Sequence, residues 1–353
     1  MLRNIFSAGD WFLRSGIQET DGGVARHYRT DLRRNSPIST EITGYAAHTL
    51  VYLHSLNGDE RYLAGAESAA RFLACKAWQP ETRTMPFEIE PGRYTYFFDC
   101  GIVARGLLAV WRATGNDQYL ETAAALGAAM VRDFSAPEGD FHPVLELPAR
   151  QPIERDGARW SRSPGCYQLK SAMAWWELAE ATGDKRFRAH YDRVLEQALQ
   201  TDREFLPGHP DRAKVMDRLH AFAYFLEGLL PRAAEPCCAA ALRDGIARMR
   251  VLLEEIAPVF ERADVYAQLL RIRLYADAAG VVPLDRAAAE DEAHTLRGFQ
   301  AASGEPQLDG GFYFGRRGSE WLPYVNPVST AFALQALAQY HGGSGLPLRH
   351  LLI

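Results

Sequence analysis

Apolar residues recur along this chain in helix-length segments, and six of these segments are apolar on nearly every side. They cover residues 40–56, 99–114, 166–182, 217–230, 262–279 and 327–340. Six more amphipathic segments lie at residues 2–16, 59–76, 117–133, 184–200, 236–256 and 285–301. An amphipathic helix packs one face on a neighbour, whereas a helix that is apolar all round is enclosed by protein. The pattern therefore predicts six inner and six outer helices.

Tight turns join each early inner helix to the outer helix that follows. In NGDERYL (57–63), GNDQYL (115–120) and GDKRF (183–187), a glycine closes one helix and an aspartate opens the next. These segments read as αα-hairpins. The last inner helix has no successor, and the N-terminal helix has no predecessor. Because GIQETDGGVARHY (16–28) resembles FQAASGEPQLDGGFYF (299–314), the N-terminal helix is predicted to be the sixth outer helix.

Six hairpins whose ends meet predict an all-α fold, an (α/α)6 barrel or toroid that forms a single domain over residues 1–353. An open solenoid is the alternative, but it needs polar capping repeats, and neither end of this chain has their character. Short strands are expected only in loops, for example at residues 141–146 or 311–314.

Polar stripes interrupt the apolar inner helices. Glu41, Tyr45, His48 and Tyr52 follow one another at i, i+4, i+7 and i+11, and therefore share one helix face. Two later inner helices repeat the pattern, with Asp217, His220, Tyr224 and Glu227 on one, and Asp264, Gln268, Arg271 and Tyr275 on the other. In a ring, parallel inner helices open their N-termini on one rim, so the polar residues there are expected to line a common cavity.

The candidate site residues come from these helix starts, from the stripes and from aromatic loops. The catalytic candidates are Glu41, Asp99, Asp217 and His220. The substrate-binding candidates are Tyr45, His48, Trp160, Arg162, Tyr167, Lys170, Tyr224, Asp264, Tyr266, Arg271, Trp321 and Asn326. Flat aromatic faces beside carboxylates, arginines and tyrosine hydroxyls suit a sugar ring.

Each candidate also has a purely structural interpretation. An aspartate at a helix start commonly caps the helix or complements its dipole, and Glu41 could form a capping box with Ser39. A histidine on an apolar helix, such as His220, is commonly a hydrogen-bonded core residue. Lys170 differs, because a buried ammonium is costly unless a carboxylate or an anionic ligand accompanies it.

Composition narrows the function classes. With a net charge of −5 and a pI near 6.1, the chain lacks the excess of basic residues that is typical of proteins that bind nucleic acid or an anionic membrane surface. No stretch approaches 18 uncharged apolar residues, and the N-terminus lacks the features of a signal peptide. Five cysteines without a paired framework fit reduced thiols, so a cytoplasmic protein is expected.

The hairpin repeat and the phrase DGGFYFG resemble the α/α-toroid proteins, which include the six-hairpin glycosidase-like superfamily and the terpenoid-cyclase and prenyltransferase toroids. STEITGY, FFDCG with GLLAVWRATGNDQYL, YQLKSAMAWWELAEATGD and LHAFAYFLEGLL resemble, more closely, a toroid family associated with bacterial polysaccharide biosynthesis, over about residues 35–340. By position, the resemblance places the catalytic carboxylates of glycosidase-like members at Glu41, Asp99, Asp217 and Asp264. The DxDD and DDxxD motifs of terpenoid chemistry are absent, as is the zinc set of protein prenyltransferases, and Cys237–Cys238 is expected on an outer helix.

The leading hypothesis is a carbohydrate-active enzyme that acts on a bacterial polysaccharide or its precursor through rim carboxylates, without a metal or cofactor. Glycoside hydrolysis would use two carboxylates as acid and as base or nucleophile. Uronate lyase or epimerase chemistry would instead move a proton through His220, Tyr167 or Lys170, with Arg162 or Arg271 neutralising the substrate carboxylate. The alternatives are a non-catalytic glycan- or partner-binding toroid and a terpenoid-cyclase-like toroid.

Overall fold

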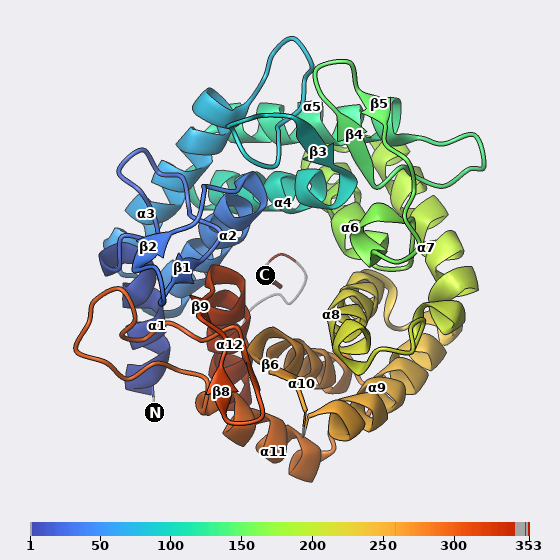
Figure 1. Cartoon of the computed structure of the whole chain (residues 1–353). Coiled ribbons are helices and arrows are strands. Elements are labelled where there is room, and N and C mark those ends of the chain that lie inside the picture. The colour runs from blue at the N-terminus through green and yellow to red at the C-terminus, as the bar shows by residue number, and fades with distance from the viewer. Residues whose placement is uncertain (1, 258, 343–349, 351) are drawn as a thin grey trace. The chain divides into compact units, whose positions relative to one another are not determined.

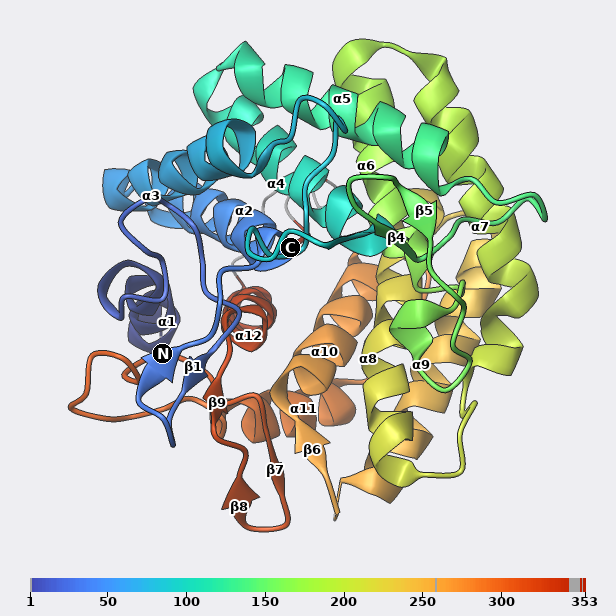
Figure 2. The same ribbon diagram turned by 45° about the horizontal axis from the view of Figure 1, so that its top comes forward.

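A computed structural model describes residues 2–257, 259–342, 350 and 352–353 of this protein. Twelve α-helices dominate these described residues (Figures 1 and 2). Their contacts divide the chain into two compact units. The early unit holds residues 18–26 and 37–201, and the late unit holds residues 1–17, 27–36 and 202–353. A single domain over residues 1–353 stays a prediction.

Three αα-hairpins build the early unit. They are α2 (Thr40–Asn57) with α3 (Glu60–Arg71), α4 (Phe97–Thr114) with α5 (Asp117–Phe134), and α6 (Gln168–Thr182) with α7 (Lys185–Phe205), whose last turn belongs to the late unit. A π-helical turn, Phe72–Ala77, extends α3. Gly58, Gly115 and Gly183 end the inner helices with φ of 69°, 71° and 74°. This left-handed conformation costs glycine little, and it confirms the predicted glycine ends of these helices. Asp59 caps α3 as predicted, but the side chain of Asn116, rather than the predicted aspartate, caps α5.

The inner helices of the early unit pack backbone against backbone, and α3 and α5 lie over them as an outer layer (Figure 1). A Cβ on Gly106 of α4 would lie 2.4 Å from the Gly44 carbonyl oxygen of α2, and one on Gly101 would lie 2.0 Å from Ser171 Oγ of α6. Ser171 Oγ in turn donates to the Phe97 carbonyl at 2.9 Å. Glycine at these positions therefore lets α4 approach α2 and α6 closely.

The late unit repeats the scheme. Its hairpins are α8 (Arg212–Leu229) with α9 (Pro236–Ile256), α10 (Ala263–Ala278) with α11 (Arg286–Arg297), and α12 (Pro327–Tyr340) with α1 (Leu2–Arg14). Helix α1 packs on α12, and Trp11 Nε1 donates to the Gln307 carbonyl at 2.8 Å. The prediction that the N-terminal helix serves as the outer partner of the last inner helix is confirmed.

One predicted helix start is wrong. The sequence placed the start of the fourth inner helix at Asp217, but α8 begins at Arg212, and the Asp211 side chain caps it by accepting from the Ala213 N–H at 2.9 Å. The charged residues before Asp217 hid this first turn, because they lack the apolar periodicity that marks the rest of the helix. Asp217 therefore lies in the second turn, and its side chain is 46% exposed.

Among the described residues, nine short strands form three antiparallel sheets in the loops. They are β3 (Tyr94–Tyr96), β4 (Val144–Glu146) and β5 (Gln151–Pro152) in the early unit, and β1 (Tyr28–Arg29), β2 (Arg34–Asn35), β9 (Tyr324–Val325), β6 (Glu261–Arg262), β7 (Gly315–Arg317) and β8 (Glu320–Trp321) in the late unit. Strand β4 lies in the predicted segment 141–146, whereas segment 311–314 makes only isolated bridges before β7. Strands β3 and β6 lead directly into α4 and α10, as Figure 2 shows for β6.

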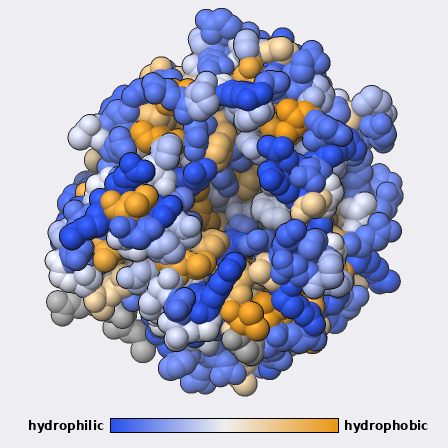
Figure 3. All heavy atoms as spheres, viewed as in Figure 1, coloured by the Kyte–Doolittle hydropathy of each residue, from blue (hydrophilic) through white to orange (hydrophobic). Residues whose placement is uncertain are grey.

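Two short 3-10 helices, Trp160–Arg162 and Leu230–Arg232, complete the described elements. Hydrophilic residues predominate on the face in Figure 3, and hydrophobic residues gather there in small separate groups. The exposed large hydrophobic residues among those described are Leu32, Val251, Val259 and Trp321. Within the described part of the chain, no helix has both the length and the apolar character needed to cross a membrane.

Candidate active site

Two carboxylates lie at the starts of neighbouring inner helices in the early unit. Ser39 caps α2 through Oγ, which accepts from the Ile42 N–H at 3.5 Å, and this cap places Glu41 in the first turn. Strand β3 delivers the chain into α4, so that Asp99 lies in the first turn of that helix with only 8% of its surface exposed. Asp99 Oδ2 is buried and has no hydrogen-bond partner among the described residues.

The two carboxyl groups influence each other's protonation. Burial raises the pKa of Glu41 from 4.5 to about 7, although the Arg26 guanidinium opposes the shift. Burial also raises the pKa of Asp99 well above its usual range, and the negative charge of Glu41 raises it further. Two carboxyl groups that repel each other in a dry environment release their protons in separate steps. One carboxylic acid and one carboxylate can therefore coexist near neutral pH.

Aromatic and basic side chains surround this pair. The charge of Asp99 contributes to the raised pKa of Tyr96, which burial raises first, while Arg162 lowers it. Burial raises the pKa of Tyr167 far above its usual value, with Asp99 adding to the effect. Tyr167 donates its hydroxyl proton to the Ser163 carbonyl at 3.0 Å, and the Trp160 ring packs edge-on against it at 5.0 Å. The early unit thus brings Trp160, Arg162 and Tyr167 near Asp99, and their role in substrate binding stays a prediction.

Sequence reasoning missed two members of this neighbourhood. Arg26, whose charge acts on Glu41, forms an ion pair with Glu88 at 3.3 Å. Tyr96 is the last residue of β3, three positions before Asp99. The available signals were the Asp-Gly-Gly loop before Arg26 and the aromatic run before FFDCG, but neither indicates which helix start its residues will face.

Three further candidates of the early unit are deeply buried. Lys170 is fully buried in α6, and Tyr45 and His48 are each 2% exposed in α2. The charge of His48 contributes to the low pKa of Glu177, a buried carboxylate of α6 that Arg105 and Arg112 each contact at 2.7 Å. A structural role in this ion network accounts for His48, and its role in substrate binding stays a prediction.

A second polar cluster lies in the late unit, on the second and third turns of α8 and near the start of α10. His220 Nδ1 lies 2.7 Å from Gln268 Oε1 and 3.4 Å from an Asp264 carboxylate oxygen. Arg262, the last residue of β6, donates to Asp264 Oδ1 at 3.0 Å and to Asp217 Oδ1 at 2.6 Å. The structure therefore brings the predicted residues Asp217, His220 and Asp264 together through Arg262, which the sequence did not indicate.

The protonation states of this cluster follow from burial and from Arg262. Burial lowers the pKa of His220, so its imidazole is neutral at pH 7. Burial alone would raise the pKa of Asp264, but the Arg262 guanidinium holds it below its usual value. Because an amide oxygen only accepts hydrogen bonds, His220 Nδ1 donates to Gln268 Oε1, and Nε2 carries the lone pair that a general base needs.

The remaining candidates of the late unit have other surroundings. The Tyr224 ring packs edge-on against His220 at 4.5 Å, and the Tyr266 hydroxyl donates to Glu261 Oε1 at 3.0 Å. Arg271 is fully buried, forms an ion pair with Glu227, and donates to Gln335 Oε1 at 2.9 Å and to the Ile353 carbonyl oxygen at 3.0 Å. This burial supports a structural role for Arg271.

Two loop candidates differ in exposure. Asn326 caps α12, since Oδ1 accepts from the Val328 and Ser329 N–H groups at 2.8 and 3.2 Å. Trp321 is 41% exposed and stacks on Tyr313, with ring centroids 4.9 Å apart. Capping explains Asn326, whereas the role of the exposed Trp321 ring in substrate binding stays a prediction.

The late unit also contains a cavity of about 580 Å³ bounded by α9, α10, α11 and the loop that carries β6. Glu261, Tyr266 and Glu292 line it, and burial raises the pKa of Glu292 to about 7 despite its ion pair with Arg273. Tyr266, predicted to bind substrate, therefore faces this cavity.

Comparisons with solved structures identify the fold class. A sugar epimerase from a ruminal bacterium matches with a TM-score of 0.71 and 11% identity, over 98% of this chain and all of that one. A cellobiose 2-epimerase from Bacillus thermoamylovorans matches with a TM-score of 0.71 and 11% identity, over 96% of this chain and 99% of that one. A D-mannose isomerase matches with a TM-score of 0.71 and 9% identity, over 96% of each chain. No family model matches this chain, and no curated protein matches it in sequence.

At these identities the likeness shows the fold. The chain has the (α/α)6 toroid fold of these structures, which confirms the predicted fold class. The similar structures are carbohydrate-active enzymes, among them epimerases, an isomerase and, with a TM-score of 0.61, an α-1,6-mannanase.

Proposed function

We propose that this protein is a carbohydrate-active enzyme whose acid–base residues are Glu41 and Asp99. The observation that carries the proposal is the pair of mutually repelling carboxyl groups of half-buried Glu41 and buried Asp99, with Asp99 Oδ2 lacking a hydrogen-bond partner among the described residues. Holding carboxyl groups of like charge near each other in a partly dry environment costs stability, and groups with such shifted pKa values are typical of active sites. The fold shared with carbohydrate enzymes supports a sugar substrate.

In glycoside hydrolysis the protonation states of the Glu41 and Asp99 carboxyl groups decide which group acts as the acid and which as the base or nucleophile. The carboxyl group that keeps its proton near pH 7 donates it to the glycosidic oxygen, and the ionised one acts as base or nucleophile at the anomeric carbon. The half-buried Trp160 ring, which packs on Tyr167 near Asp99, provides an apolar face for a pyranose ring. Arg26 and Arg162 provide hydrogen-bond donors for the oxygens of that sugar. A bacterial polysaccharide or its precursor is the proposed substrate.

Epimerisation or isomerisation of a sugar is the second candidate, and the late unit favours it. His220 is neutral, and its Nδ1 is held by Gln268 and Asp264, so that Nε2 can remove a proton from carbon. The sugar epimerases and the mannose isomerase among the similar structures agree with this chemistry. In this case His220, rather than the carboxyl pair, exchanges the substrate proton.

Two readouts on one panel of bacterial oligosaccharides separate these reactions. Hydrolysis releases new reducing ends without placing deuterium on carbon, whereas epimerisation or isomerisation in D2O incorporates solvent deuterium into a carbon–hydrogen bond of the sugar. For hydrolysis we expect Asp99→Asn and Glu41→Gln each to lower kcat by about 10²- to 10⁴-fold, the usual contribution of general acid–base catalysis. For proton exchange on carbon we expect the same loss in His220→Gln.

The matched control is Glu121→Gln, which removes an exposed carboxylate from α5 of the same unit. Full activity in both Asp99→Asn and Glu41→Gln would refute the carboxyl pair as the catalytic group. Saturable sugar binding without either reaction would instead support the non-catalytic glycan-binding alternative.

A further inference from the structure

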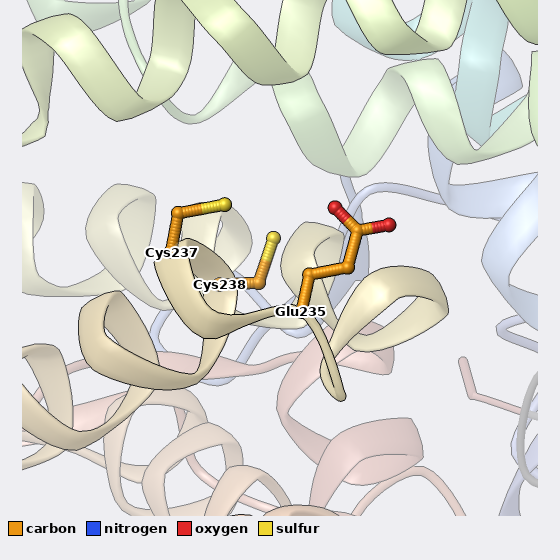
Figure 4. Close-up of side chains that lie close together, drawn as sticks. All are labelled: Glu235, Cys237 and Cys238. Atoms are coloured by element: carbon orange, nitrogen blue, oxygen red, sulfur yellow. The ribbon is translucent and has the colours of Figure 1, made fainter.

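Three potential metal ligands of different chemistry converge at the start of outer helix α9. Glu235 precedes the helix, and Cys237 and Cys238 occupy its first turn after Pro236. One carboxylate oxygen and both Sγ atoms lie within 4.8 Å of one another, and Figure 4 shows the three side chains on the same side of the turn. We propose that Glu235, Cys237 and Cys238 form a Zn²⁺ site.

The backbone arranges this convergence. Pro236 fixes the first helical residue, and Glu235 has the extended backbone of an N-cap residue (φ −74°, ψ 137°) without a side-chain capping bond. The Glu235 carboxylate is therefore not committed to the helix and can turn toward the two thiols. A tetrahedral zinc ion with Zn–S bonds near 2.3 Å needs sulfur atoms about 3.8 Å apart, so small side-chain rotations would complete the set.

Charge also favours a divalent cation here. Two thiolates and one carboxylate carry three negative charges, and Arg232, which forms an ion pair with Glu235, contributes one positive charge. A divalent ion therefore brings the group to neutrality.

The ligand types point to zinc among common divalent ions. Thiolates exclude Mg²⁺ and Ca²⁺, which prefer oxygen ligands, whereas two sulfurs and one carboxylate oxygen with a water as fourth ligand suit Zn²⁺. Cys237 is exposed and Glu235 is half-buried, so an ion can reach the site from solvent, while Cys238 is buried and fixes its inner edge. The proposal departs from the metal-free expectation drawn from the sequence, and it is independent of the proposed sugar chemistry.

The test uses the full chain, freed of metal by a chelator and kept reduced. Titration with Cd²⁺, a zinc substitute, is followed by thiolate-to-metal charge-transfer absorption, and Zn²⁺ affinity by competition with a chromogenic chelator. We expect one equivalent of Cd²⁺ to give the absorption band. Loss of a residue that only supports a metal ligand typically weakens metal binding by roughly 10- to 100-fold. We expect Cys237→Ser, which removes a ligand, to weaken Zn²⁺ binding by more than this. We expect Glu235→Gln to weaken Zn²⁺ binding less than Cys237→Ser does.

Cys75→Ser is the matched control, because Cys75 is an exposed cysteine on another helical segment. Unchanged binding in Cys75→Ser together with loss in Cys237→Ser supports the site. Absence of saturable Cd²⁺ binding in the wild type, or equal affinity in Cys237→Ser and the wild type, overturns it. Cys237 is exposed, so its substitution tests the proposal without disturbing the core, and circular dichroism confirms that the variant is folded.

Discussion

Replacing Glu41 with glutamine is expected to stabilise the fold at neutral and alkaline pH while leaving acid stability unchanged. Glu41 lies in the first turn of α2, where burial raises its pKa from 4.5 to about 7 and where its charge also raises the pKa of Asp99. Glutamine keeps the size of the side chain and remains neutral at every pH. The substitution therefore removes a charge that the folded state holds at a cost.

The magnitude follows from the two pKa values. The folded chain keeps the Glu41 proton up to about pH 7, whereas the unfolded chain releases it near pH 4.5. Between these values the folded state binds more protons, so the stability of the wild type falls as the pH rises. The fall is about 1.4 kcal/mol per pH unit, about 3 kcal/mol over the whole window. Glu41→Gln is expected to be more stable than the wild type by up to this amount at pH 8, and equally stable below pH 4.5.

Urea denaturation of the wild type and of Glu41→Gln at a series of pH values from 4.5 to 8 measures this difference. Glu121→Gln, which removes an exposed carboxylate of α5, serves as the control and is expected to follow the wild type. The reasoning fails if Glu41→Gln loses stability at pH 8, or if its difference from the wild type does not change with pH. Loss of sugar turnover in the stabilised variant would show that the buried charge serves function at the expense of stability.

Two further substitutions test the packing of the early unit. Glu177→Ala is expected to lower the free energy of unfolding by about 3–5 kcal/mol in urea denaturation, because it leaves the buried Arg105 guanidinium without this counter-charge. In the wild type the stabilisation from Glu177 is lost as the pH falls from 4.5 toward 2, since the nearby arginines outweigh burial and lower its pKa to about 2. Gly101→Ala is expected to lower the Tm, with a loss of at least about 1–3 kcal/mol, because its Cβ would lie 2.0 Å from Ser171 Oγ. Gly157→Ala, with nothing within 4 Å of its Cβ, is expected to change the Tm little, and equal Tm values for the two variants would contradict the packing argument.

The amino-acid sequence by itself determined the helices and their pairing. Apolar periodicity and the glycine turns placed nearly every helix within a few residues, and the repeat around the two Asp-Gly-Gly loops assigned α1 to α12. These features are local, because a helix and its caps are encoded by residues three or four positions apart. The late start of the predicted fourth inner helix shows where local signals fail, since Arg212 begins α8 in a polar turn without apolar spacing.

Only the tertiary structure decided what the polar residues do. Glu41 and Asp99 have similar sequence settings to Asp264, yet burial raises the pKa values of the first two, whereas Arg262 lowers that of Asp264. Arg271, which belongs to the same kind of stripe as Glu41, is fully buried in an ion pair. The sign of a pKa shift depends on solvent exclusion and on charges that come from distant parts of the chain. For that reason the spacing of polar residues along the helices identified the candidate site residues, whereas the packing of the strands before α4 and α10 determined their protonation states.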